Sequence, residues 1–393
     1  EWGEAINFDG PDSEPVRQMF IANGGYWIDE FHLDGLRLDA TQQIFDKSPE
    51  HILAAAGKRA REAAGQRSIV LIAENENQES RFVRPLAQGG YGLDGLWNDD
   101  FHHSAMVALT GRADAYYSDT RGDPQEIISA AKYGFLFQGQ CYSWQGKRRG
   151  TPAWGLPPSA FVGYLQNHDQ IANSARGLRG HQITSPGMWR AMTAVLLLGP
   201  WTPLMFQGQE LEVSSPFLFF ADFEGEIGAA VRKGRGEFLS QFASVREFVT
   251  KSSLDDPCDP ATFERCKLDP RSRDTTGHAY ALHFDLLRIR RDEVAFSQRP
   301  GGVDGTVLER TAFALRFFTP DHRDDRVLLV NLGSDLTRSS IAEPLLAPPD
   351  GATWTLRWSS EDPRYGGSGT PELWKDDDWR VPGQCAILLA PTG

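Results

Sequence analysis

The sequence predicts an α/β barrel portion followed by an antiparallel β-domain. Short apolar segments that end in polar or charged residues alternate with helical periodicity, as in a barrel of parallel strands. From about Thr306 the sequence pattern changes to short apolar strands separated by Pro, Gly and Asp. We therefore assign residues 1–300 to a (β/α)8 TIM barrel represented by its strands four to eight, and residues 306–393 to a β-sandwich domain.

The first elements show the alternation. A helix is predicted over Ser13–Asp29, capped by Ser13 or Asp12. Strand alternation is clear from Gly35 to Asp39, and a helical stretch over Pro49–Ala64 follows. The continuous apolar run Ser68–Glu74 is typical of a parallel strand that is covered on both faces.

Later segments repeat the pattern. The predicted barrel strands are Gly92–Trp97, Phe161–Gln166 and Pro203–Phe206. A helix around His278–Arg291 and a turn region at Gln298–Gly305 lead to the C-terminal strands Thr311–Phe318, Asp325–Leu332, Thr353–Trp358 and Cys385–Ala390. A doubly wound open sheet would give similar segments, but no Gly-x-Gly-x-x-Gly follows any strand.

Composition excludes several classes of protein. The 393 residues are 40% hydrophobic, enough for a large domain and a smaller one, and no apolar run is long enough to cross a bilayer. A formal net charge of -13 argues against nucleic acid or an anionic membrane as partner. The four cysteines are scattered without a Cys-x-x-Cys pair, which favours reduced thiols in a cytoplasmic protein.

Three acids end three separate predicted strands: Asp39, Glu74 and Asp169. Together they would face one crater, which is costly unless their charges are used. Arg37 lies on the same side of its strand as Asp39 and could hold that carboxylate ionised, although a structural ion pair is an equal alternative.

The segments GLRLDA, IAEN and LQNHDQ resemble three of the four signature regions of the α-amylase superfamily. The resemblance implies a retaining glycosidase with Asp39 as nucleophile, Glu74 as acid/base and Asp169 as transition-state stabiliser. Arg37 and His168 would support them. Such cleavage needs only carboxylates, and we expect no cofactor and no metal.

Within that superfamily, the segments WNDDFHH at residues 97–103, SPFLFFADFEGEIGAAVRKGRGEF at 215–238, WGEAINFDG at 2–10 and DPATFERCKLD at 259–269 resemble the maltooligosyltrehalose trehalohydrolases. This implies hydrolysis of the α-1,4 bond next to the terminal trehalose of maltooligosyltrehalose or a related α-glucan. A glycogen branching enzyme or another α-1,4-glucan enzyme is second, and a catalytically incomplete glucan-binding fragment is third. The first signature region is absent, so we expect a missing N-terminal part of the same enzyme as partner.

The loop after predicted strand six is expected to bind the leaving-group sugars. Its polar residues are Asn98, Asp99, Asp100, His102 and His103. The alternative is a helix start with Asn98 or Asp99 as cap. We expect one acid to cap the helix and the other to bind sugar.

Overall fold

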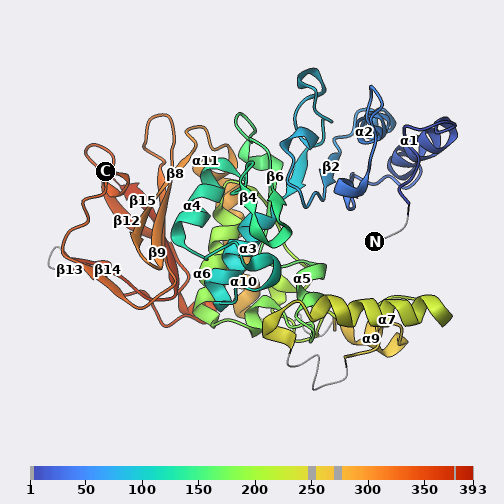
Figure 1. Ribbon diagram of the computed structural model, residues 1–393. Helices are drawn as coiled ribbons and strands as arrows, with labels where there is room; N and C mark the ends of the chain where they lie inside the picture. Colours follow the sequence, from blue (N-terminus) through green and yellow to red (C-terminus); the bar gives the residue numbers. More distant parts are fainter. Residues whose placement is uncertain (1–3, 247–253, 270–276, 376–377, 393) are drawn as a thin grey trace. The chain divides into compact units, whose positions relative to one another are not determined.

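The computed structural model describes residues 4–246, 254–269, 277–375 and 378–392 (Figure 1). Part of the opening segment at residues 2–10 lies outside this range. The chain forms two compact units, each assembled from two stretches of sequence. Residues 1–99 and 133–163 form the first unit, and residues 100–132 and 164–393 form the second. The predicted boundary between residues 300 and 306 stays a prediction.

The first unit contains parallel strands and two helices that pack against each other. The elements are α1 (Glu14–Asp29), α2 (Ile52–Ala64), β1 (Gly35–Leu38), β2 (Val70–Ala73), β3 (Gly95–Trp97) and β6 (Phe161–Tyr164). The strands pair in the order β1-β2-β3-β6, with Gly35 opposite Val70 and Leu96 opposite Phe161. A hairpin of β4 (Cys141–Tyr142) and β5 (Lys147–Arg148) precedes β6.

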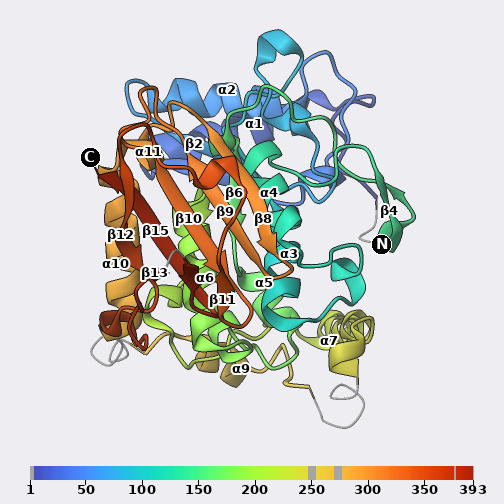
Figure 2. The ribbon, with the colours of Figure 1, turned by 90° about the vertical axis from the view of Figure 1, so that its left-hand side faces the viewer.

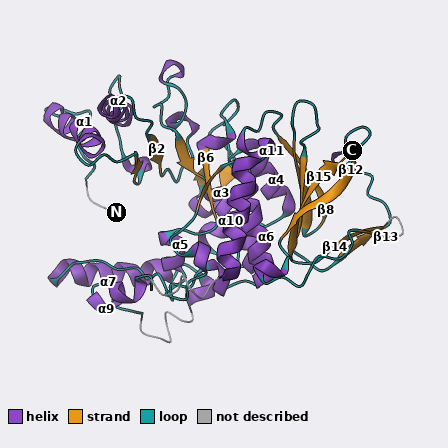
Figure 3. Cartoon of the chain, turned by 180° about the vertical axis from the view of Figure 1, so that it is seen from behind, coloured by secondary structure: helices purple, strands orange, loops and turns teal. Residues whose placement is uncertain are grey.

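The predicted barrel portion is confirmed. β1, β2, β3, β6 and β7 (Thr202–Leu204) fall at the five predicted strands. α-Helices lie along the chain between β1 and β2, between β3 and β6 and between β6 and β7, whereas two short 3-10 helices connect β2 to β3. Figure 3 colours helices and strands separately. Two local expectations are wrong. Val70, in the strand expected to be covered on both faces, is 52% exposed. The Ser13 side chain makes no capping hydrogen bond, because Ser13 itself already has helical φ and ψ angles.

Most helices belong to the second unit. They are α3 (Asp99–Thr110, beginning at the last residue of the first unit), α4 (Pro124–Tyr133), α5 (His168–Asn173), α6 (Pro186–Leu198), α7 (Gly225–Leu239), α9 (Pro260–Cys266), α10 (Gly277–Asp292) and α11 (Val294–Ser297). α6 is buried almost throughout and packs on α10 and on the C-terminal sheet. Ser185 caps α6 by accepting from the Met188 N–H, and α10 matches the helix predicted there.

An antiparallel sheet of five strands forms the C-terminal part, in the order β12-β15-β10-β9-β8 (Figure 2). Its strands are β8 (Val303–Glu309), β9 (Ala312–Phe317), β10 (Arg326–Asn331), β12 (Thr353–Ser359) and β15 (Cys385–Thr392). A small sheet has the order β11-β14-β13 and contains β11 (Leu336–Arg338), β13 (Trp374–Lys375) and β14 (Asp378–Val381). The four predicted C-terminal strands are present. The turn predicted up to Gly305 is wrong at its end, because β8 begins at Val303.

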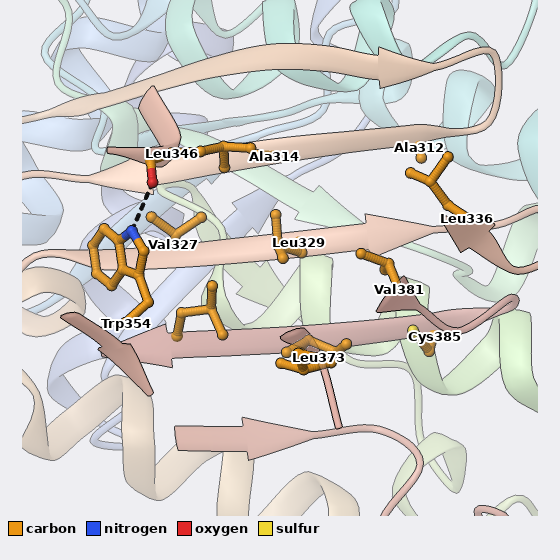
Figure 4. Packing of buried hydrophobic residues seen from close by; sticks show 12 residues of the cluster. Ala312, Ala314, Val327, Leu329, Leu336, Leu346, Trp354, Leu373, Val381 and Cys385 are labelled. Carbon is orange, nitrogen blue, oxygen red and sulfur yellow. Dashed lines mark hydrogen bonds between the residues drawn. The ribbon is translucent and has the colours of Figure 1, made fainter. Parts of the chain in front are cut away.

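A buried apolar cluster joins the two C-terminal sheets (Figure 4). Leu329 of β10 is completely enclosed, and Val381 of β14 and Leu373, which directly precedes β13, reach the same cluster. The indole N–H of Trp354 donates to the Leu346 carbonyl at 2.8 Å, so the ring is buried with its polar atom satisfied. Burial of apolar side chains from both sheets therefore holds this part together.

We expect Leu329→Ala to lower the free energy of unfolding by about 2–5 kcal/mol, because it leaves a cavity in this cluster. Leu356→Ala, at a site on β12 that is 45% exposed, should cost about 0.5 kcal/mol or less. Urea unfolding followed by tryptophan fluorescence measures both. Equal losses for the two variants would contradict the assignment of the cluster as the core of this part.

Candidate active site

Asp39 and Glu74 leave neighbouring parallel strands at the same end. β1 and β2 pair with Leu38 opposite Ala73, and the Glu74 N–H donates to the Leu38 carbonyl at 2.9 Å. Asp39 and Glu74 therefore each follow directly after the paired residues Leu38 and Ala73. The carboxyl ends of parallel strands carry the chemistry in barrel folds, and this register brings the two carboxylates together there.

A single guanidinium binds both acids. Arg37 Nη1 donates to Asp39 Oδ1 at 2.5 Å, and Nη2 donates to Glu74 Oε2 at 2.5 Å. Its Cζ lies 4.3 Å from the centroid of the Trp97 ring at the end of β3, which adds a cation–π contact. The fork of Arg37 thus fixes both carboxylates relative to each other.

The two carboxylates differ in environment. The Asp39 side chain is 74% exposed, whereas that of Glu74 is 24% exposed. Burial raises the pKa of Glu74 to about 7, and a hydrogen bond and the charge of Asp39 also raise it. Arg37 and the Ala40 N–H, which donates to Glu74 Oε2 at 3.2 Å, act in the opposite direction. Near neutral pH Glu74 can therefore hold or release a proton.

Asp169 and His168 belong to the second unit, in the first turn of α5. The Asn167 side chain caps this helix by accepting from the Asp169 N–H at 2.9 Å. His168 Nε2 lies 3.5 Å from Asp169 Oδ2, and both side chains are about half exposed. The structure thus places this predicted acid–histidine pair side by side on an accessible turn.

Sequence analysis missed Arg235 of α7. It is half-buried, donates to Asn173 Oδ1 at 2.9 Å, and lies close enough to Asp169 for the two charges to interact. Burial lowers the pKa of Arg235 to about 10, although the neighbouring Asp169 opposes this shift. Arg235 lies in the segment at residues 215–238, whose resemblance to the trehalohydrolases implied no role for an individual residue.

The expected loop after β3 is instead the start of α3, which begins at Asp99, as the alternative from the sequence had it, and its polar residues are mostly interior. Asn98, Asp100, His102 and His103 are buried, and Asp99 is the partly exposed member of the predicted set. Asn98 donates to the Gly134 carbonyl at 3.2 Å.

The two histidines in the first turns of α3 pack against tyrosines in the second unit. His102 contacts the Leu165 carbonyl through Nδ1 and the Tyr117 hydroxyl through Nε2, and His103 stacks on Tyr116. Burial lowers the pKa of His102 to about 3, so its ring is neutral at physiological pH.

No group of three or more His, Cys, Asp or Glu residues is placed to hold a metal ion within the described ranges. The described helices also include none long and apolar enough to span a membrane.

Comparison with known proteins identifies the relatives of this chain. A family model described as a domain of unknown function (DUF3459) matches residues 300–374. The chain is 37% identical to a malto-oligosyltrehalose trehalohydrolase from Arthrobacter ramosus over 74% of this chain and 51% of the relative. It is 36% identical to the protein of that name from Deinococcus radiodurans, over 85% of this chain and 54% of the relative.

A solved structure agrees with these relatives. A protein from Salmonella typhimurium, provisionally assigned as an alpha amylase, superposes with a TM-score of 0.79 at 30% identity, covering 99% of this chain and 62% of that one. The chain spans about half the length of the curated relatives it matches. The resemblance predicted from the signature motifs is confirmed. The chain belongs to the α-amylase superfamily and is related there to the malto-oligosyltrehalose trehalohydrolases.

Proposed function

We propose that the chain is the catalytic part of a retaining glycoside hydrolase that cleaves the α-1,4-glucosidic bond next to the terminal trehalose of maltooligosyltrehalose, releasing trehalose and a maltooligosaccharide. The single observation that carries a hydrolytic role is the clamp of Asp39 and Glu74 by Arg37 at 2.5 Å each. The names of the relatives from Arthrobacter ramosus and Deinococcus radiodurans support the choice of substrate.

In this proposal the two clamped acids divide the chemistry. Glu74, whose pKa is raised to about 7, donates its proton to the glycosidic oxygen as the bond to the leaving sugar breaks. Asp39 attacks the anomeric carbon and forms a glycosyl-enzyme bond. Glu74 then takes a proton from the water that hydrolyses this bond. Two carboxylates that share one guanidinium suit the separation of about 5–5.5 Å in retaining enzymes better than the roughly 6.5–9.5 Å of inverting ones.

The remaining predicted residues have supporting roles in this proposal. Asp169 stabilises the positive charge that develops on the sugar ring, and His168 hydrogen-bonds a hydroxyl. Asp99, which keeps solvent access, takes the sugar-binding role expected for one of the two neighbouring acids, whereas Asp100 is enclosed. The four cysteines are free thiols, which favours a reducing compartment, and we propose a cytoplasmic location.

The first test is product analysis. Incubated with maltooligosyltrehalose, the chain should release free trehalose, and Glu74→Gln should lower the rate by at least about 100-fold because the proton donor is lost. Chromatography of the products measures this. New α-1,6 linkages from amylose would favour a branching enzyme, to which a 26% identical Myxococcus xanthus relative points. Substrate binding without any product would favour a glucan-binding role.

The second test concerns the clamp. Arg37→Lys should lower kcat by more than it raises KM, because a single ammonium cannot hold both carboxylates in the planar, forked geometry of the guanidinium. Steady-state kinetics on maltooligosyltrehalose give the two parameters separately. An unchanged kcat with a raised KM would assign Arg37 to substrate binding alone.

The third test concerns the proton donor. Carbon-13 NMR of labelled glutamate carboxyls should show Glu74 titrating near pH 7. The kcat/KM of the chain should fall as pH rises through that value, because the ionised form cannot donate. Asp39→Asn should lower the pKa of Glu74, since it removes a neighbouring negative charge. A midpoint near the ordinary 4.5, insensitive to Asp39→Asn, would contradict the assignment.

A further inference from the structure

The β4–β5 hairpin holds an arginine that the proposed reaction does not yet use. Cys141 pairs with Arg148 in the hairpin, and the ladder continues one residue further. The Arg149 N–H donates to the Gln140 carbonyl at 3.0 Å, and the Arg149 carbonyl accepts from the Gly139 N–H at 2.8 Å. The backbone of Arg149 is therefore fixed as the last rung of the hairpin.

The hairpin is tied to the loop that follows Glu74. The Gly150 N–H donates to the Asn77 carbonyl at 2.8 Å, Lys147 Nζ donates to Asn77 Oδ1 at 3.1 Å, and Gln145 hydrogen-bonds Glu76. Gly150 has a φ of +73°, and a Cβ there would lie 1.6 Å from the Phe137 carbonyl oxygen. Only glycine fits, so the position of the preceding arginine is set by backbone geometry.

Arg149 is a buried charge with a defined acidic partner. Its side chain is 1% exposed, and its guanidinium lies 4.7 Å from the centroid of the buried Tyr142 ring. Nη2 lies 3.3 Å from Asp99 Oδ2, while the Asp99 side chain remains 19% exposed. Burying a guanidinium costs several kcal/mol, and a well-packed apolar side chain would often serve stability as well. An arginine in this place is therefore better explained by what it does to Asp99.

We propose that Arg149 is a positioning residue, which holds the carboxylate of Asp99 as a fixed hydrogen-bond acceptor for the hydroxyls of the leaving sugar. The inference rests on the proposed function for the identity of that sugar, a non-reducing glucose disaccharide. The pair joins an enclosed cation to an anion with solvent access. Arg149 thereby orients the Asp99 carboxylate from its buried side. The solvent-exposed part of that carboxylate remains available to hydrogen-bond a neutral ligand.

Fixed orientation is what gives such a site its selectivity. A carboxylate held in one place bonds hydroxyls that arrive in the matching geometry, and a sugar that lacks them leaves the buried pair poorly satisfied. A mobile aspartate would adapt to either sugar. The connection from the hairpin to Asn77 also links this acceptor to the strand that carries Glu74.

The experiment is a double-mutant cycle on disaccharide binding, with Arg149→Ala, Asp99→Asn and the double variant in the full 393-residue chain. Isothermal titration calorimetry with trehalose and with maltose gives the dissociation constants, and the thermal midpoint monitors folding. We expect Arg149→Ala to weaken trehalose binding about tenfold or more. It should have little further effect in the Asp99→Asn background, because it acts through that carboxylate.

Two matched variants separate positioning from structure. Arg148→Ala removes a neighbouring, exposed arginine whose guanidinium donates to the Gly139 carbonyl, and it should leave both affinities unchanged. Arg149→Lys should restore the thermal midpoint but only part of the affinity, because lysine keeps the charge and loses the fork.

Equal weakening by Arg149→Ala with and without Asp99 would overturn the proposal, as would binding of neither disaccharide. Suppose that the chain binds maltose but not trehalose, and that Arg149→Ala weakens maltose binding only when Asp99 is present. This result would support the positioning role and count against trehalose as the leaving group.

Discussion

The contact on which the site depends is the double hydrogen bond from Arg37 to Asp39 and Glu74. Two neighbouring carboxylates repel each other and would otherwise share a proton. A forked cation that hydrogen-bonds both carboxylates offsets this repulsion. The clamp in turn requires close pairing of β1 and β2. A Cβ on Gly35 would lie 2.1 Å from the Val70 carbonyl oxygen, so any other residue there would push the strands apart.

Environment then separates the two acids. Asp39 projects into solvent beside the guanidinium of Arg37. Glu74 is more enclosed and bears the desolvation that raises its pKa. The same arginine contacts both, so the difference comes from exposure. The paired ends of β1 and β2 therefore place an exposed carboxylate, Asp39, beside a more enclosed one, Glu74. A nucleophile and a proton donor need such different environments.

The sequence predicted the parallel strands and the two acids that directly follow β1 and β2, because strand alternation and strand-end polarity are local patterns, whereas Asp169 lies in the first turn of α5 and not at the end of β6. It failed where a residue's role is set by distant neighbours. Gly305 resembles a turn residue, yet in β8 it makes room for Leu315 and Ile128, whose atoms would lie 2.8 and 2.9 Å from a Cβ. Arg149 lies in a connection too long for an ordinary loop, a signal of function, but its pairing with Asp99 depends on a hairpin that sequence does not reveal.

Among the polar residues at the start of α3, solvent access and charge distinguish a side chain that could bind a ligand from one that serves the interior. His102 is neutral because burial lowers its pKa to about 3, so it contributes hydrogen bonds to the interior and no charge. Asp99 instead keeps both a cationic partner and access to solvent. An acidic carboxylate balanced by a guanidinium presents acceptors without net charge, which suits an uncharged polyhydroxyl ligand. A carboxylate without a cationic partner would attract cations. A carboxylate that is paired with and oriented by an arginine instead discriminates between sugars by the positions of their hydroxyls.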